Sequence, residues 1–502
     1  MGAKKPKREF AMSPKSFDDL IKTSINRAPV VREVVADLET PLSVYLKLAN
    51  CANSYLFESV HGGEKWGRYS LIGLHSPTVL TVYGSKLEVT RGGEVIAECD
   101  TSDPLSEIER FRALFSLKAL PNLPRFTGGL VGYFGYDTVR YVEPCMGQNV
   151  PMDALKTPDI LLMSSDEVAV FDNLSGKITL VVHCESGNNR SRQEAEKRLD
   201  TFQNDLASPL DKLPQLELSP RKNLNFVSSF GRDQYMDSVD RIKNYIFAGD
   251  VMQVVLSQRL SAPFKSVPIN LYRALRIFNP SPYMYYLDLG SFQIVGSSPE
   301  VLARFEDGFV TVRPIAGTRR RGLNEQEDKL LEAEMLSDPK ELAEHLMLID
   351  LGRNDVGRIS KAGTVILTEK MVAERYSHVM HMTSNVRGET DYGIGPIDVL
   401  RATLPAGTLS GAPKIRAMQI IDELEPIKRN IYGGAVGYIG WNGNMDTAIA
   451  IRTAVVKEGV VHVQAGGGVV ADSNPASEWD ETMNKAQALI EAAAMAAGAV
   501  AK

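Results

Sequence analysis

The sequence contains little cysteine and little histidine, and neither residue type forms a recognisable binding pattern. Four cysteines and seven histidines occur among 502 residues. Cys51, Cys99, Cys145 and Cys184 are widely separated, and no two of them stand in a C-x-x-C pair. This spacing suggests neither a cysteine-based zinc site nor a disulfide framework.

Long apolar runs and excess positive charge are missing as well. The most apolar segment, 486–501, is rich in alanine and is interrupted by Glu491, so it predicts a terminal helix rather than a membrane span. No signal peptide is recognisable, and we expect a cytoplasmic protein with no membrane partner. A net charge of −6 and a pI near 5.8 argue against a nucleic-acid partner, because general nucleic-acid binders are basic.

The composition is otherwise ordinary for a globular protein, with 44% hydrophobic and 24% charged residues. The length allows about three average domains or one large two-lobed body. Strand patterns joined by hairpins, with helices between runs of strands, predict an α+β fold rather than a doubly wound sheet. We divide the chain into a disordered tail (1–15), an N-terminal lobe (16–206), a linker rich in Pro, Ser and Lys (207–225) and a larger lobe (226–502).

A helix is predicted over 337–358. Asp338 is a plausible N-cap, and the proline that follows it suits the first helical position. Leu342, Leu346 and Ile349 recur at helical spacing. We therefore expect these three side chains to form the buried stripe of the helix.

Two pairs of glutamates suggest a metal site. Glu341 and Glu344 lie three residues apart on the helix over 337–358, and a second helix opened by Asn474-Pro475 carries Glu478 and Glu481. This spacing places both carboxylates of a pair on one helix face. One such pair is usually a solvated surface, because Glu is rarely buried. The repeated pair favours a hard cation such as Mg²⁺, which prefers oxygen ligands.

Two strand ends and one loop carry further candidates. Glu300 follows a strand and a proline turn, where desolvation would raise its pKa and make it a general acid, although a surface turn is the plainer interpretation. The arginine-rich stretch 314–322 would attract an anionic substrate or pair with the acidic helix after it. Of His378 and His381, one could be structural and one functional, because histidine titrates near neutral pH.

Two glycine-rich stretches could bind an anion. The small-residue stretch 404–414 opens a helix but does not match the P-loop pattern. Its helix N-terminus would still present N–H groups to a carboxylate. The run 466–468 would act similarly by bringing backbone N–H groups against a ligand, and a hairpin turn is its structural alternative.

Taken in order, these motifs resemble those of the chorismate-utilising enzymes, most closely the large synthase components of anthranilate synthases. The matching stretches are GSSPE, PIAGTRRRG, ELAEHLMLIDLGRND, ERYSHVMH, AGTLSGAPK, IYGGAVGYIGW, IRTAVV and QAGGGVVADSNPASEWDETMNKA. They cover nearly all of 225–490, whereas the N-terminal lobe matches mainly through LFES and GGLVGYFGYD. The resemblance implies a two-lobed fold with antiparallel sheets packed face to face and helices outside.

The implied activity is that of a lyase in tryptophan biosynthesis, which converts chorismate and ammonia into anthranilate and pyruvate with Mg²⁺. Glu300 would be the general acid that assists departure of the 4-hydroxyl, and His381 would assist the elimination of pyruvate. The metal ligands would be Glu344 and Glu481, with Glu341 and Glu478 in support. The chorismate site would be lined by Thr318, Thr408, Tyr432, Arg452, Gly466, Gly468 and Lys485.

Two residues separate alternatives within the family. Water-using relatives resemble this chain but have a lysine base at the position of Gln253, and an amide cannot serve as a base. Aminodeoxychorismate synthases have a nucleophilic lysine where this chain has Ala316, so amination at C2 is favoured over C4. An enzyme that stops at aminodeoxyisochorismate, and a non-catalytic tryptophan sensor, remain as alternatives.

The resemblance also implies a partner and an inhibitor. No cysteine has the G-x-C-x-G surroundings of a glutaminase nucleophile, so ammonia would come from a separate glutamine amidotransferase subunit. The expected assembly is two synthase plus two glutaminase chains, or a homodimer alone. Tryptophan would inhibit at a pocket formed by LFES and NPSPYM. Its residues would be Glu58, Ser59, Asn279, Pro280, Ser281, Pro282, Tyr283 and Met284.

Overall fold

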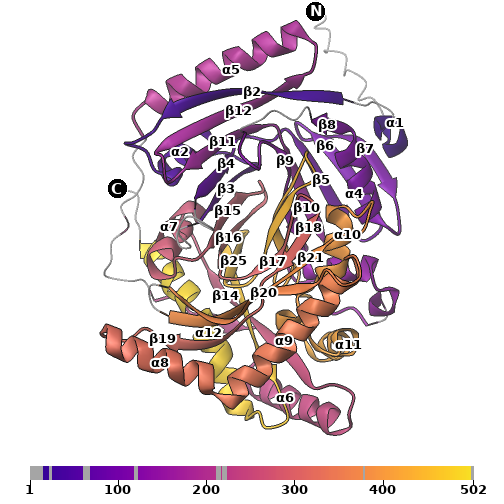
Figure 1. Cartoon of the computed structure of the whole chain (residues 1–502), viewed down its shortest axis with the longest axis vertical. Coiled ribbons are helices and arrows are strands. Elements are labelled where there is room, and N and C mark those ends of the chain that lie inside the picture. The colour runs from indigo at the N-terminus through magenta and orange to yellow at the C-terminus, as the bar shows by residue number, and fades with distance from the viewer. Residues whose placement is uncertain are drawn as a thin grey trace, which may run out of the picture.

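The computed structural model describes residues 15–21, 25–59, 68–117, 123–147, 149–210, 216, 223–376 and 379–498. Strands of these residues form two sheets, called sheet A and sheet B here, of thirteen strands each. Helices lie on the outer sides of the sheets (Figure 1). In the described part of the chain, no helix is long and apolar enough to cross a membrane.

Sheet A runs in the order β1-β7-β6-β5-β10-β9-β23-β24-β17-β18-β21-β19, and β20 pairs with β21. All its pairs are antiparallel except β1 with β7. Its strands are β1 (Lys15–Ser16), β5 (Thr78–Tyr83), β6 (Lys86–Arg91), β7 (Glu94–Asp100), β9 (Gly129–Phe134), β10 (Ile160–Ser165), β17 (Val301–Glu306), β18 (Phe309–Val312), β19 (Ile315–Arg320), β20 (Ile366–Arg375), β21 (Val379–Glu389), β23 (Ala435–Gly440) and β24 (Met445–Ile449).

Sheet B runs in the order β13-β14-β26-β25-β16-β15-β3-β4-β11-β12-β2-β8, and β22 pairs with β14. Only β2 and β8 are parallel. Its strands are β2 (Ile25–Val35), β3 (Ser54–Glu58), β4 (Tyr69–Gly73), β8 (Phe115–Leu117), β11 (Glu167–Asp172), β12 (Lys177–Glu185), β13 (Val227–Ser228), β14 (Gln253–Pro263), β15 (Tyr283–Asp288), β16 (Phe292–Ser298), β22 (Gly411–Ala412), β25 (Thr453–Lys457) and β26 (Val460–Val469).

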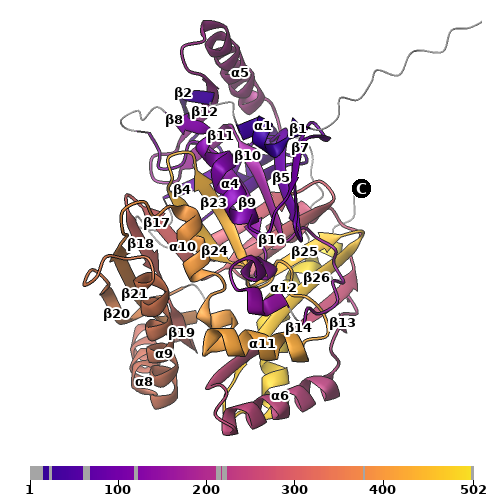
Figure 2. The ribbon, with the colours of Figure 1, turned by 90° about the vertical axis from the view of Figure 1, so that its right-hand side faces the viewer.

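The helices pack mainly on the outer faces of the sheets (Figure 2). They are α1 (Phe17–Ile21), α2 (Pro41–Leu48), α4 (Pro104–Ala113), α5 (Asn189–Ala207), α6 (Arg232–Phe247), α7 (Pro268–Phe278), α8 (Glu325–Ser337), α9 (Pro339–Gly357), α10 (Pro396–Thr403), α11 (Lys414–Leu424) and α12 (Pro475–Gly498). Three short 3₁₀ segments are η1 (Tyr136–Tyr141), η2 (Pro144–Gly147) and η3 (Gly407–Leu409).

The inner faces of the two sheets share one apolar core. Tyr55 and Tyr285 of sheet B pack in the same cluster as Val131 and Tyr133 of sheet A. All four are buried. Two larger clusters lie elsewhere, one joining sheet B to α2, α5, α7 and α12, and one joining sheet A to α4 and α10. The predicted α+β fold, with sheets face to face and helices outside, is therefore confirmed.

Both sheets take strands from both sides of 207–225. In sheet A, β9 pairs with β23 and sets Gly132 opposite Gly437. A Cβ on Gly132 would lie 2.0 Å from the carbonyl oxygen of Leu161 on β10, the other neighbour of β9, so the close approach of β9 and β10 requires glycine there. The division of the chain into two lobes stays a prediction. Residues 1–14 of the predicted tail and much of the linker lie outside the described residues, whereas Lys15 begins β1.

Helix α9 begins as predicted, but its buried face differs from the prediction. The Asp338 side chain accepts hydrogen bonds from the backbone N–H groups of the first turn. Leu346 is 47% exposed, whereas His345 and Leu348 are buried. Asp350 lies one turn beyond Leu346 on the same face of the helix and is exposed. Because a charged carboxylate is rarely buried, this face of α9 points to solvent and not to the core.

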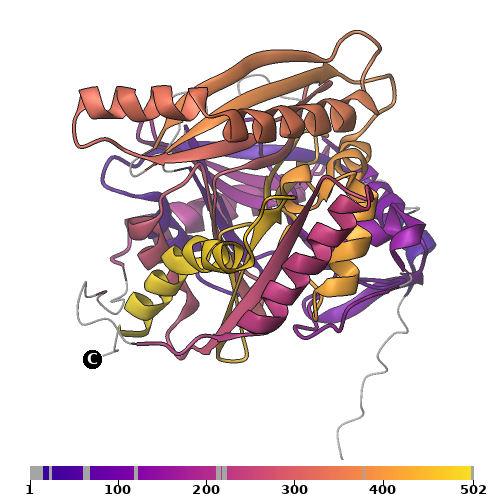
Figure 3. The ribbon, with the colours of Figure 1, turned by 90° about the horizontal axis from the view of Figure 1, so that it is seen from below.

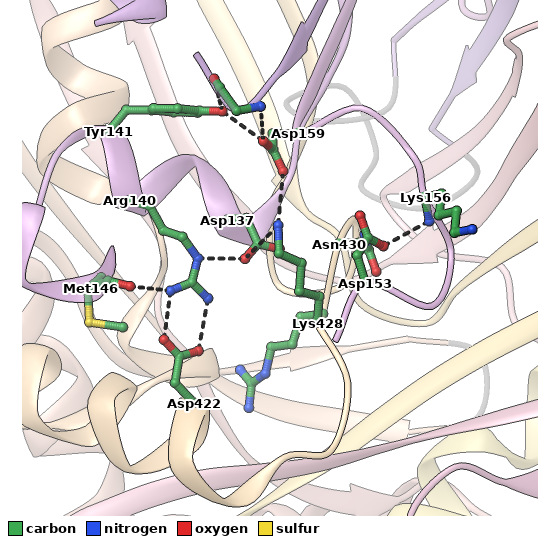
Figure 4. A network of polar contacts seen from close by, with 12 residues as sticks. Asp137, Arg140, Tyr141, Met146, Asp153, Lys156, Asp159, Asp422, Lys428 and Asn430 are labelled. Atoms are coloured by element: carbon green, nitrogen blue, oxygen red, sulfur yellow. Dashed lines mark hydrogen bonds and ion pairs between the residues drawn. The ribbon is translucent and has the colours of Figure 1, made fainter. Parts of the chain in front are cut away.

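A polar network ties the N-terminal part of the chain to α11 and to the segment after it (Figure 4). Arg140 forms ion pairs with Asp137 at 2.8 Å and with Asp422 at 2.7 Å. Lys428 lies 3.7 Å from Asp159. These contacts fix the position of the chain just before Tyr432, one of the predicted site residues.

Candidate active site

Glu300 lies in the turn between β16 and β17, where the fold excludes water from its carboxyl group. The residue is 4% exposed, and Thr408 donates its hydroxyl hydrogen to Glu300 Oε1 at 2.9 Å. Burial raises the pKa of Glu300 to about 8, against the opposing effects of the Thr408 hydroxyl, a backbone N–H and the Arg452 charge. The carboxyl group is therefore protonated at neutral pH and suited to general acid catalysis.

His381 is a buried neutral histidine on β21. Its Nδ1 lies 3.0 Å from Thr318 Oγ1 and 3.2 Å from the Gly317 carbonyl oxygen. A carbonyl beside Nδ1 requires a hydrogen on that nitrogen, which leaves Nε2 as the basic atom. Burial, with a smaller contribution from the Arg452 charge, lowers the pKa of His381 to about 4. The ring can therefore accept a proton during catalysis at neutral pH.

Arg452 is a cation near both Glu300 and His381. It lies between β24 and β25 with a φ of +48°, a backbone conformation that L-residues rarely adopt. Its charge affects the pKa values of both Glu300 and His381. Burial lowers the pKa of Arg452 itself. One cation therefore lies near both groups, where a carboxylate of an anionic substrate would be attracted.

Two glycines of β26 bring site side chains against the backbone. A Cβ on Gly466 would lie 3.0 Å from Tyr432 Oη, and a Cβ on Gly468 would lie 2.1 Å from Gln253 Nε2. Any other residue at Gly468 would displace the Gln253 amide. Lys485 Nζ donates to the Gly466 carbonyl oxygen at 3.1 Å. The structure thus gathers Gln253, Tyr432 and Lys485 along one strand.

The glutamates of α12 lie over the remaining glycine of this run. A Cβ on Gly467 would lie 3.1 Å from Glu478 Oε2 and 3.5 Å from Glu481 Oε1. Glu478 is 8% exposed, and its Oε2 has no hydrogen-bond partner among the described residues. Burial raises the pKa of Glu478, and the Glu481 charge raises it further. Glu481 itself pairs with Lys485 at 2.7 Å.

The glutamates of α9 face those of α12. Desolvation raises the pKa of Glu344, and repulsion from Glu341 and then Glu481 adds to the effect. Glu341 pairs with Arg319 at 3.0 Å. Among the described residues, no three His, Cys, Asp or Glu side chains are already close enough to hold a metal ion. The donor type nevertheless fits a hard divalent cation, because mutually repelling carboxylates and the unpartnered oxygen of Glu478 would all gain from one.

A buried ion pair that the sequence did not reveal supports the Thr408 loop. Arg429 donates to the Glu425 carboxylate at 2.6 Å, to the Leu409 carbonyl oxygen at 2.6 Å and to the Val255 carbonyl oxygen at 2.7 Å. Arg429 is 2% exposed. A Glu and an Arg four residues apart usually form a solvated surface pair, so their spacing gave no signal of burial.

A cavity lies between the sheets and is lined in part by residues of the predicted inhibitor pocket. It has a volume of about 480 Å³, and Glu58, Ser59, Pro282, Tyr283 and Met284 are among its lining residues. The predicted Asn279, Pro280 and Ser281 do not line it. Sequence reasoning missed the charged residues of its wall, which come from scattered strands and loops. They are Arg68, Arg125, Arg304, Glu306 and Asp446.

Strand β15 lines one side of this cavity, and helix α7 holds the lining residue Glu58. Glu58 forms an ion pair with Arg276 at 2.7 Å and accepts the Tyr272 hydroxyl at 2.7 Å. Tyr283 donates its hydroxyl hydrogen to Asp446 at 2.9 Å. Instead of lining the cavity, Ser281 donates its hydroxyl to the backbone carbonyl of β16 at Ser298. The cavity thus combines aromatic walls with charges of both signs, as an amino acid ligand would require.

Comparison with known proteins gives a consistent result. The model of the chorismate binding enzyme family matches residues 60–491. The chain is 58% identical to anthranilate synthase component 1 of Pseudomonas aeruginosa over 97% of this chain and 99% of that protein, and 56% identical to that of Neisseria meningitidis serogroup B over 94% and 96%. The crystal structure of anthranilate synthase component I from Streptococcus pneumoniae has a TM-score of 0.75 at 38% identity, covering 91% of this chain and 99% of that one.

Proposed function

The chain belongs to the chorismate-binding enzyme family, and we propose that it converts chorismate and ammonia into anthranilate, pyruvate and water. The observation that carries this proposal is the arrangement around Arg452: a buried protonated carboxyl group and a buried neutral imidazole lie near one cation. An acid and a base with separate roles are needed for a reaction that first expels a hydroxyl group and then eliminates pyruvate.

In the first step ammonia forms a bond to C2 of chorismate, the ring double bonds shift, and the C4–O bond breaks. The ammonium group formed at C2 releases one proton to solvent. The departing oxygen takes the Glu300 proton and leaves as water. In the second step His381 Nε2 takes the hydrogen at C2 as a proton, and the C3–O bond breaks. The released enolate of pyruvate then takes a proton on its CH2 carbon from the protonated His381, which gives pyruvate and restores the neutral imidazole. The product ring is then aromatic, which makes this step strongly favourable.

Two side chains support ammonia as the nucleophile and C2 as its target. The Gln253 amide is buried against Gly468 and cannot activate water as a base. Ala316 is buried on β19 and offers no amine for covalent attack. Arg452 and Lys485 supply positive charge for the carboxylates of chorismate.

Mg²⁺ is the proposed cofactor, bound by Glu344 and Glu481 with Glu341 and Glu478 in support. The cation would supply positive charge beside a substrate carboxylate. Before it binds, the chain's own Arg319 and Lys485 compensate two of the four glutamates. Lys485 would then be released from Glu481 to face the substrate.

A glutamine amidotransferase subunit is the proposed source of ammonia, and tryptophan is the proposed inhibitor. The 480 Å³ cavity between the sheets is the proposed tryptophan site. Its aromatic side chains would contact the indole ring, and its charged groups would bind the amino and carboxylate groups. Replacement of Ser59 by alanine should weaken tryptophan inhibition about tenfold, the effect of losing roughly 1.4 kcal/mol. Unchanged inhibition would remove Ser59 from the site.

The reaction is tested with the purified chain, chorismate, Mg²⁺ and concentrated ammonium, with products identified by mass and fluorescence. Anthranilate and pyruvate in equal amounts, lost on chelation and restored by Mg²⁺, are expected. A C4-aminated product, or an aminated product that keeps the pyruvyl group, would replace this proposal by one of the alternative activities. Tryptophan binding without turnover would indicate a sensor. Glu344→Gln should raise the Mg²⁺ concentration needed, and full activity at unchanged Mg²⁺ would refute its role as a ligand.

A further inference from the structure

Glu300 must regain a proton after each turnover, and its burial makes this a structural problem. Its carboxyl group becomes ionised when the 4-hydroxyl departs as water. The residue is 4% exposed, and bound chorismate would cover it further. A route for protons that avoids the substrate is therefore needed, because a buried carboxylate cannot collect a proton directly from solvent.

A second cavity reaches Glu300 from the side of α9 and η3. It has a volume of about 40 Å³, and of the proposed chorismate-site residues only Glu300 and Thr408 line it. A water molecule needs about 10–15 Å³ of such space, so several can fit. Leu351, Gly352 and Gly407 line the cavity and are partly exposed. The cavity therefore extends from the surface to the general acid.

Asp355 supplies this cavity with a proton-carrying group. It is 5% exposed, and its Oδ2 pairs with Lys414 at 2.8 Å. Its Oδ1 is buried and has no hydrogen-bond partner within the described part of the chain. A buried carboxylate oxygen without a partner is costly, so it is expected to bind water or a proton.

The charges around the two carboxyl groups differ. Asp355 faces Lys414 and the more distant Arg358, whereas Glu300 faces Arg452. Arg313 lines the cavity between them and forms an ion pair with Glu374 at 2.9 Å. Burial raises the pKa of Asp355 above its ordinary value, and the Lys414 and Arg358 charges oppose that rise, so both carboxyl groups of the cavity can carry a proton.

We propose that this cavity is the proton route to Glu300 and that Asp355 delivers protons into it. The proposal rests on the proposed function, since it needs Glu300 as the acid. After the C4–O bond breaks and the oxygen leaves with the Glu300 proton, the Glu300 carboxylate takes a proton from water in the cavity. That water takes the proton of the Asp355 carboxyl group, and Asp355 regains one from the cavity water that reaches the surface beside Leu351, Gly352 and Gly407. Asp355 acts through Glu300 and does not touch the substrate.

The test compares the first turnover with the steady state in Asp355→Asn. Asparagine keeps the shape and can still accept the Lys414 hydrogen bond, but it carries no exchangeable acid proton at neutral pH. The first turnover uses the proton already on Glu300 and should keep the wild-type rate. Later turnovers should slow about tenfold or more, with a larger solvent isotope effect, since a positioned proton-transfer group contributes about 10²- to 10⁴-fold.

Two variants of Leu351 test the cavity without changing Asp355. Leu351→Phe should fill the mouth and reproduce the slow steady state with a normal first turnover, whereas Leu351→Met keeps the volume and should behave as wild type. Asp350→Asn, on the same helix but exposed, controls for loss of a carboxylate. The proposal would be overturned if Asp355→Asn and Leu351→Phe slow the first and later turnovers equally. It would also be overturned if neither of these two variants slows any turnover. Absence of anthranilate from wild type would instead overturn the proposed function.

Discussion

The hydrogen bond from Thr408 to Glu300 should set the upper pH limit of the reaction. Its hydroxyl hydrogen points at an oxygen that becomes charged when Glu300 ionises. A donor to the ionised form lowers the pKa, so the bond holds the Glu300 pKa below the value that burial alone would give. Replacement of Thr408 by valine removes the donor while nearly keeping the shape, and the pKa of Glu300 should rise.

The size of this shift follows from the strength of such a bond. A hydrogen bond to a charged group contributes about 1.5–3 kcal/mol, and each pKa unit corresponds to about 1.4 kcal/mol. The Glu300 pKa should therefore rise by about one to two units from its value of about 8. Because the protonated form is the active one, activity in Thr408→Val should persist to a higher pH than in wild type, even if its maximum is lower.

The assay is the pH dependence of kcat/KM for chorismate, which reports groups of the free enzyme. Total ammonium is adjusted at each pH to keep free ammonia constant. Thr408→Ser retains the hydroxyl donor, so the alkaline limb of its pH profile should stay at the wild-type position. Glu300→Gln removes the acid and should lower the rate by about 10²- to 10⁴-fold. An alkaline limb that stays in place or moves to lower pH in Thr408→Val would refute the assignment of that limb to Glu300.

The pH dependence of the unfolding free energy gives an independent measure of the Glu300 pKa. The Glu300 pKa is about 8 in the fold against 4.5 as the ordinary value, so the folded chain keeps a proton that the unfolded chain releases in this window. Stability therefore falls as pH rises from about 4.5 to about 8, by a total on the order of 3–5 kcal/mol. Glu300→Gln mimics the protonated form and should escape this loss, so its unfolding midpoint relative to wild type should increase with pH. A difference that does not vary with pH would contradict the raised pKa.

Three further predictions concern packing and coupling. Arg140→Met should lower the unfolding free energy by about 3–5 kcal/mol in urea titrations, because it leaves Asp422 buried without its partner, and adding Asp422→Asn should recover part of the loss. Gly468→Ala should lower kcat/KM by about 10²-fold with little change in Tm, because the new methyl group displaces the Gln253 amide. Normal activity in this variant would show that catalysis does not depend on the position of that amide. Ser281→Ala should weaken tryptophan inhibition more than tryptophan binding measured by calorimetry, and equal losses would assign Ser281 to the binding site instead.

Part of the site was predictable because some of its residues stand in locally recognisable motifs. The N-cap at Asp338 is such a signal, and the structure has the predicted cap there. The glycine run 466–468 was recognised as well, but it lies inside β26 and not in the hairpin turn that was its structural alternative. Which stripe of α9 is buried depended on the sheet beneath it, so Leu346 was placed wrongly. The spacing of Leu342, Leu346 and Ile349 is equally compatible with two neighbouring faces until a partner surface is known.

Residues that act through distant contacts gave no sequence signal. Asp355 and Lys414 are 59 positions apart, and their pairing depends on α9 meeting the start of α11. The cavity charges Arg304 and Asp446 likewise come together only because β17 pairs with β24. Sequence periodicity describes one element at a time, whereas these pairs are produced by sheet topology. They are therefore the part of the site that required the structure.

The sheet topology also gives a physical reason for coupling the proposed inhibitor cavity to the general acid. Tyr283 and Met284 line the cavity, and in the β15–β16 ladder they pair with Ser298 and Ser297, which lie two and three residues before Glu300. A ligand that shifts β15 must therefore shift the turn that holds Glu300, unless the ladder breaks. Because tryptophan inhibits only by favouring one arrangement over another, the two arrangements should differ in this turn. Amide hydrogen exchange at 297–300 with and without tryptophan is the direct observation, and unchanged exchange there would place the coupling elsewhere.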